Sequence, residues 1–124
     1  MKHVFVLPAY NESATIQAVI VSLKSLGTIV VVDDCSLDET ASIAERAGAV
    51  LVRHKQNKGY DGALNSGFKM ASTLGAEFVF TFDADGQHGI DALKAAMNLF
   101  ENDKNLDLVV GQRAQAARFA EALY

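Results

Sequence analysis

Two aspartates, Asp83 and Asp85, follow the apolar run 78–82 with one residue between them. Two carboxylates about 4 Å apart repel each other by about 4 kcal/mol at an effective dielectric constant of 20. In an extended chain, positions i and i+2 point to the same side, so both charges meet in one place. Oxygen ligands of this kind suit Mg²⁺ or Mn²⁺, which complete their shell with water and substrate phosphates. We therefore predict a divalent-cation site there, with Gln87 and His88 within reach.

Two further polar clusters follow apolar runs, "PAYNE" at 8–12 and "DDCS" at 33–36. In the first, Tyr10 offers a ring that can lie along a base, while Asn11 or Glu12 can cap a helix or hydrogen-bond a sugar. In the second, one carboxylate of Asp33 and Asp34 can accept hydrogen bonds from a base or ribose, and the other can cap the next helix. Both clusters are therefore candidates for nucleotide binding.

The segment "NKGYDGALNSGFK" at 57–69 contains three glycines, Gly59, Gly62 and Gly67. The pattern is not a P-loop, because Phe68 separates Gly67 from Lys69 and no Ser or Thr follows the lysine. A glycine-rich turn that lets backbone approach a ligand at the start of a helix remains an interpretation, beside that of a simple turn.

The elements that must position these clusters alternate along the chain. Continuous β-branched runs are typical of strands buried on both faces, and they are separated by stretches of helical period. The expected strands are 3–8, 28–34, 49–54, 77–83 and 106–111. This order predicts right-handed βαβ crossovers and a doubly wound, mostly parallel sheet in a three-layer α/β/α sandwich. Ligands bind at the carboxyl ends of such strands, where the polar clusters lie.

The expected helices have identifiable ends. Ile16, Val19, Ile20 and Leu23 share one helical face. Gly27 stands where a C-terminal glycine belongs. Ser36 and Glu39 have the spacing of a capping box for a second helix, which Gly48 ends. Further helices are expected over 60–74 and 90–102. His3 and His54 fall in expected strands and are interpreted as structural.

Length and composition predict one folded domain over residues 1–124. Half the residues are hydrophobic and the net charge is −4, which gives no electrostatic footprint for nucleic acid. No apolar run reaches the roughly 20 residues of a membrane-spanning helix. The lone Cys35 forms no internal disulfide, which agrees with a reducing compartment. We expect a cytoplasmic protein.

The motifs "PAYNE", "VVVDDCSLDET", "NKGYDGALNSG" and "FDADGQH", in this order, resemble the family 2 glycosyltransferases with the GT-A fold. "DADGQH" is most similar to the branch that makes polyprenyl-phosphate sugars, such as dolichyl-phosphate mannose synthase. The resemblance covers residues 3 to about 113. It implies an enzyme that binds a UDP- or GDP-sugar through a divalent metal and transfers the sugar, with a lipid phosphate at the cytoplasmic face of the membrane as the expected acceptor.

The resemblance also implies a role for individual residues. The nucleotide-binding residues would be Pro8, Tyr10, Glu12, Asp33, Asp34 and Gly62, with Asp33 or Asp34 reading the base and ribose. Asp83 and Asp85 would be catalytic and, with Gln87, would hold Mg²⁺ or Mn²⁺. Arg113 in "GQR" would lie near the site.

The chain departs from the family pattern in two places. "GIDAL" follows the metal motif where prolines and Glu are common, and the acceptor-binding C-terminal half of the family is missing after Tyr124. Residues 1–124 thus read as the nucleotide-sugar-binding domain alone. The last strand, 107–110, would then be an open edge, and we expect a homodimer through this edge or through a C-terminal helix.

Three other interpretations compete with this one. A non-catalytic nucleotide-sugar-binding module would keep the donor site without turnover. A haloacid-dehalogenase-type phosphatase would use Asp83 as nucleophile and Asp85 as acid, but its motif belongs near the N-terminus. A receiver-type signalling domain would have its acidic pair after the first strand, whereas Asp33 and Asp34 follow the second.

Overall fold

The computed structural model describes residues 2–84, 94–95, 97–98, 108–110 and 121–123. Contacts divide the chain into two compact units, Met1–Gly86 and Gln87–Tyr124. The first unit alternates strands and helices as the sequence predicted. Its elements are β1 (His3–Ala9), α1 (Ile16–Leu23), β2 (Thr28–Asp33), α2 (Thr40–Arg46), β3 (Val50–Arg53), α3 (Gly59–Thr73) and β4 (Phe78–Thr81).

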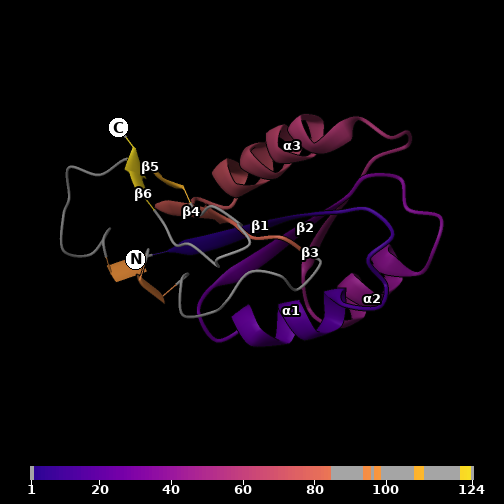
Figure 1. The fold of residues 1–124 in the computed structure, drawn as a ribbon, viewed down its shortest axis with the longest axis horizontal. Helices are drawn as coiled ribbons and strands as arrows, with labels where there is room; N and C mark the ends of the chain where they lie inside the picture. Colours follow the sequence, from indigo (N-terminus) through magenta and orange to yellow (C-terminus); the bar gives the residue numbers. More distant parts are fainter. Residues whose placement is uncertain (1, 85–93, 96, 99–107, 111–120, 124) are drawn as a thin grey trace. The chain divides into compact units, whose positions relative to one another are not determined.

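The four strands of this unit form one parallel sheet in the order β3-β2-β1-β4. Helices α1 and α2 cover one face and α3 covers the other (Figure 1). The predicted three-layer α/β/α architecture is confirmed. Because β2 and β3 lie on one side of β1 and β4 on the other, the strand order reverses between β1 and β4, and a ligand crevice is expected there.

The central strands are buried on both faces, which explains their continuous apolar sequence. Residues 4–7 of β1 and 30–32 of β2 have no exposed surface. On one face of the sheet, Val4, Val6, Val30 and Val32 pack with Ala63 and Ala71 of α3. On the opposite helical layer, the four residues predicted from the stripe of α1 are buried: Ile16, Val19, Ile20 and Leu23.

Two local predictions about the helix ends are wrong. Helix α2 begins at Thr40, and its N-cap residue Glu39 makes no side-chain capping bond. Ser36 instead accepts a hydrogen bond from the Asn11 N–H, so no capping box forms. Gly27 was predicted as the C-terminal glycine of α1, but the structure requires glycine there for another reason. The His3 backbone packs against it, and a Cβ at Gly27 would lie 2.5 Å from the His3 carbonyl oxygen. Gly48, with φ of 98°, ends its helix as predicted.

The second unit contains a two-stranded antiparallel sheet of β5 (Leu108–Val110) and β6 (Glu121–Leu123). The fifth strand was expected in the main parallel sheet with an open edge; it pairs with β6 instead. The C-terminal helix was predicted without bounds, and the described residues 121–123 near the end of the chain form a strand. Most of the helix expected over 90–102 lies outside the described residues. Within the described residues, no helix is both long and apolar enough to cross a bilayer.

Candidate functional site

The site lies at the carboxyl ends of β1, β2 and β4, where three predicted polar segments come together. Pairing of β1 with β2 sets Ala9 beside Asp33. The Asp34 N–H donates to the Ala9 carbonyl over 2.9 Å, which continues this pairing past the end of β2. The Thr15 hydroxyl, at the start of α1, donates to the Ala84 carbonyl over 2.6 Å. Ala84 lies between the two aspartates of the predicted metal motif, so the loop after β4 meets the loop after β1.

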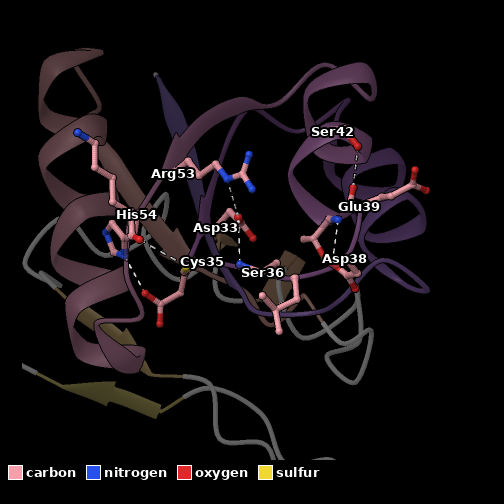
Figure 2. A network of polar contacts seen from close by, with 12 residues as sticks. Asp33, Cys35, Ser36, Asp38, Glu39, Ser42, Arg53 and His54 are labelled. Carbon is pink, nitrogen blue, oxygen red and sulfur yellow. Dashed lines mark hydrogen bonds and ion pairs between the residues drawn. The ribbon is translucent and has the colours of Figure 1, made fainter.

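Asp33 is a buried carboxylate whose two oxygens have different contacts within the described residues. Its side chain has no exposed surface, although it ends a strand at the candidate crevice. Oδ2 lies 3.5 Å from Arg53 Nε and accepts from the Ser36 N–H (Figure 2). Oδ1 is buried and has no hydrogen-bond partner among the described residues. A buried carboxylate oxygen without a partner is costly, and a ligand donor would remove that cost.

Asp34 has a different environment although it is the next residue. Its Oδ1 accepts from His54 Nδ1 and from the Lys58 N–H, both over 2.8 Å. Its Oδ2 accepts from the Gly59 N–H over 2.9 Å. These N–H groups open α3, so Asp34 caps α3; the sequence interpretation that it caps the next helix, α2, is wrong. Burial raises the pKa of Asp34, but the hydrogen bonds from His54, Lys58 and Gly59 outweigh burial and lower it below its usual value.

His54, interpreted as structural from the sequence, makes two side-chain contacts that the sequence did not predict. It follows β3 directly and is 7% exposed. Besides its contact with Asp34, its Nε2 lies 2.7 Å from Ser66 Oγ in α3. The sequence carries one usable signal, because His54 stands at a strand's carboxyl end like the predicted site residues. The apolar run that precedes it is typical of a histidine in the core, so the local sequence favours a structural role over a place at the site.

The loops after β1 and β2 are joined by hydrogen bonds that sequence reasoning did not foresee. The Asn11 N–H donates to Ser36 Oγ, and the Leu37 N–H donates back to Asn11 Oδ1, both over 2.8 Å. The Glu12 N–H donates to Thr40 Oγ1 over 2.9 Å. Asn11 therefore does not cap α1, and its Oδ1 already accepts one hydrogen bond within the protein.

Asp38 completes this junction. It accepts from the Ser13 N–H over 3.2 Å and from the Thr40 N–H over 2.9 Å, and the Thr40 hydroxyl also donates to it. The hydrogen bond from the Thr40 hydroxyl lowers the pKa of Asp38 most, and with the other hydrogen bonds it brings this pKa to about 2. The junction thus depends on an ionised carboxylate.

The other predicted nucleotide-binding residues lie along the same edge. Pro8 is half-buried in β1, and Tyr10, just beyond β1, is 45% exposed. Glu12 is half-buried and its N–H is used in the junction. Gly62 lies within the first turns of α3, where an added Cβ would come within 2.7 Å of Lys58 Cβ. At Gly62 the space that a side chain would fill is therefore occupied by the Lys58 side chain, and it is not open to a ligand.

The predicted metal ligands are only partly described. Asp83 is half-buried and lies two residues beyond β4. Asp85, Gln87, His88 and Arg113 lie outside the described residues. Within the part of the chain that is described, no three His, Cys, Asp or Glu residues gather as a metal site. The arrangement thus places Asp83 just beyond the carboxyl end of β4, and the full ligand set stays a prediction.

Comparison with known proteins defines the class. The model of glycosyl transferase family 2 matches residues 4–119, and the chain belongs to this family, as its motifs predicted. This membership replaces the phosphatase and receiver interpretations. The chain is 35% identical to the UDP-N-acetylglucosamine–dolichyl-phosphate N-acetylglucosaminyltransferase of Methanococcus voltae, with 87% of this chain and 50% of that protein covered. It is 40% identical to an uncharacterised protein of Methanocaldococcus jannaschii, covering 87% of this chain and 45% of that protein.

Solved structures agree with the GT-A assignment. Glucosyl-3-phosphoglycerate synthase of Mycobacterium tuberculosis in complex with UDP superposes with a TM-score of 0.57 at 30% identity, over 68% of this chain and 34% of that one. The same enzyme has been crystallised with Mn²⁺, UDP and glucosyl-3-phosphoglycerate, a structure that is 29% identical and covers 67% of this chain and 33% of that one, with a TM-score of 0.57. The chain spans about half the length of the curated relatives named here.

Proposed function

We propose that this chain binds a nucleotide-diphosphate sugar at the carboxyl edge of β1, β2 and β4 and serves a glycosyltransferase as its donor-binding domain. The observation that carries the proposal is the buried Asp33 Oδ1, which has no partner among the described residues and lies at the end of a central strand. A base or ribose donor would satisfy this oxygen. Asp34 is less suited to that task, because its two oxygens already accept three hydrogen bonds within the protein.

The donor diphosphate would lie toward the loop after β4. Asp83, Asp85 and Gln87 would hold a Mg²⁺ or Mn²⁺ ion, and the crystallisation of a related synthase with Mn²⁺ and UDP supports this proposal. When bound, the cation would offset charge on the leaving nucleoside diphosphate. Thr15 holds the loop that carries these aspartates through the Ala84 carbonyl, and Tyr10 offers an exposed ring for the base.

A polyprenyl phosphate at the cytoplasmic membrane surface is the proposed acceptor, which the dolichyl-phosphate relative supports. A phosphate oxygen is already ionised near neutral pH, so attack on the sugar needs no general base. If the chain binds the donor without using an acceptor, it is a nucleotide-sugar-binding module without turnover.

The test is calorimetric titration of UDP and of GDP, with and without Mn²⁺, into the wild type, Asp33→Asn and Asp83→Asn. We expect Mn²⁺-dependent binding of one nucleotide, about tenfold weaker in each variant. Glu45→Gln, an exposed position on α2, removes the same charge away from the site and should bind like the wild type. Absence of binding by the wild type, or unchanged affinity in Asp33→Asn, contradicts the proposal. Sugar transfer to a polyprenyl phosphate then separates an enzyme from a binding module.

A further inference from the structure

Asp34 uses the start of α3 as an internal ligand. The Lys58 and Gly59 N–H groups belong to the N-cap and first residue of α3, where a helix presents unsatisfied donors that commonly bind phosphate. The carboxylate of Asp34, a residue that is 5% exposed, accepts hydrogen bonds from both groups. The start of α3 is therefore hydrogen-bonded to the residue that follows β2. The position of this helix start relative to Asp33 depends on the orientation of the Asp34 side chain.

His54 holds that side chain. An ionised carboxylate only accepts hydrogen bonds, so Nδ1 of His54 carries the proton in the 2.8 Å contact with Asp34. Nε2 then accepts from the Ser66 hydroxyl in the neutral ring or donates to it in the charged ring, over 2.7 Å. The imidazole thus connects to α3 twice, through Asp34 to its first residues and through Ser66 to its middle.

The same histidine is tied to the predicted base-reading residue. Its backbone N–H donates to the Asp33 carbonyl over 2.9 Å. Arg53, the neighbour of His54, lies within 3.5 Å of the Asp33 carboxylate (Figure 2). A shift of His54 would therefore move both aspartates, although its ring touches only Asp34 and Ser66 in the contacts described above.

We propose that His54 is a positioning residue of the donor site, which acts through Asp34 to fix the first residues of α3 against the end of β2. This inference rests on the proposed function. The contact that matters is the Nδ1–Asp34 bond, because it orients the carboxylate that accepts from Lys58 and Gly59. The Nε2–Ser66 contact supports the ring from α3 and contributes less to the donor site.

Two substitutions distinguish the hydrogen bond made by Nδ1 of His54 from the one made by Nε2. Asparagine carries its N–H donors near the place of Nδ1, and glutamine carries them near Nε2, so His54→Asn can keep the bond to Asp34 while His54→Gln can keep the bond to Ser66. We expect His54→Gln to weaken nucleotide binding at least tenfold, and His54→Asn to restore the affinity to within about threefold of the wild type. In ¹⁵N NMR spectra, the Gly59 amide should shift strongly in His54→Gln and little in His54→Asn.

The outcomes are distinguishable. Failure of the wild type to bind UDP or GDP overturns the proposed function and this inference with it. If the wild type binds, equal affinity in His54→Gln, or equal losses in both variants, overturns the inference alone. If His54→Gln is unfolded by circular dichroism, Asp34→Asn replaces it, because it removes the charged acceptor of the same contact. A tenfold loss in Asp34→Asn with the Gly59 amide shifted supports positioning, and unchanged affinity overturns it.

Discussion

Adjacent aspartates at the end of β2 show how local contacts separate residues of the same type. Asp33 has a buried oxygen without a described partner, whereas Asp34 distributes three accepted hydrogen bonds over its two oxygens. The difference follows from the pleat, because successive side chains on a strand point to opposite faces. Asp34 therefore points to α3, where it accepts from the first N–H groups of the helix. Asp33 points to the other face, where Ser36 and Arg53 contact one of its oxygens.

Gly67 of α3 is required by its contact with the sheet. A Cβ at this position would lie 2.2 Å from Val6 Cγ1 in β1, and both residues are buried. Overpacking of this kind costs about 1–3 kcal/mol, which the roughly 1 kcal/mol that alanine gains in a helix offsets in part. We expect Gly67→Ala to lower the free energy of unfolding in urea by about 1 kcal/mol. Ser72→Ala, an exposed position of the same helix, should change it by less than about 0.5 kcal/mol, and equal stability of the two variants would refute the contact.

The lowered pKa of Asp38 predicts an acid-dependent contribution to stability. Its pKa falls from 3.8 to about 2 because the ionised form accepts hydrogen bonds from Thr40 and Ser13. The folded state therefore favours ionised Asp38, and this stabilisation is present above pH 4 and is lost as the pH falls toward 2. The difference in unfolding free energy between the wild type and Asp38→Asn should shrink from pH 5 to pH 2. A difference that does not change with pH would show that the carboxylate charge is unimportant.

At the scale of elements, the loops after β1 and β2 form one junction that Asn11 closes. Its φ is 53°, a left-handed conformation that costs most L-residues about 1–2 kcal/mol and glycine very little. Its side chain also accepts from the Leu37 N–H. Asn11→Gly loses only the hydrogen bond, while Asn11→Ala loses the bond and adds strain. In urea denaturation, we expect the alanine variant to be about 1 kcal/mol less stable than the glycine variant; the reverse order would mean that φ at this position relaxes.

Elements with a strong pattern were predictable from the sequence. The β-branched runs predicted β1 to β4 to within a few residues, and the stripe of α1 predicted its four buried residues. The rule that ligands bind at the carboxyl ends of parallel strands then assigns Asp33 and Asp83 to one edge of the sheet from the sequence alone. These features depend on hydrophobic periodicity, which can be recognised from residues that are close together in the sequence.

Features that depend on contacts between distant segments were not predictable. Ser36 and Glu39 have the spacing of a capping box, but Ser36 accepts from Asn11, 25 residues earlier. Gly27 resembles a helix C-cap, but its small size is needed because the His3 backbone lies against it. The role of His54 depends on Asp34 and Ser66 meeting it from two other elements. In each case a partner from another part of the chain overrides the local signal.

At the scale of the whole molecule, the order β3-β2-β1-β4 gives the first unit two inner strands. β1 is hydrogen-bonded to β2 and β4, and β2 to β1 and β3. Helices cover both faces of these strands (Figure 1). Opening β1 or β2 therefore requires most of the unit to unfold, whereas β3 and β4 can detach on one side.

This topology predicts the pattern of native-state hydrogen exchange. The amides of Val6 and Val31, from the buried middles of β1 and β2, should exchange only through global unfolding, so their exchange free energies should equal that measured by urea denaturation. Amides of β3 and β4 should exchange through smaller openings and give lower values. Because Asn11→Ala acts on the junction of the inner strands, it should lower the protection of Val6 and Val31 by the same amount as its global stability. Equal protection across all four strands would instead mean that the sheet opens only as a whole.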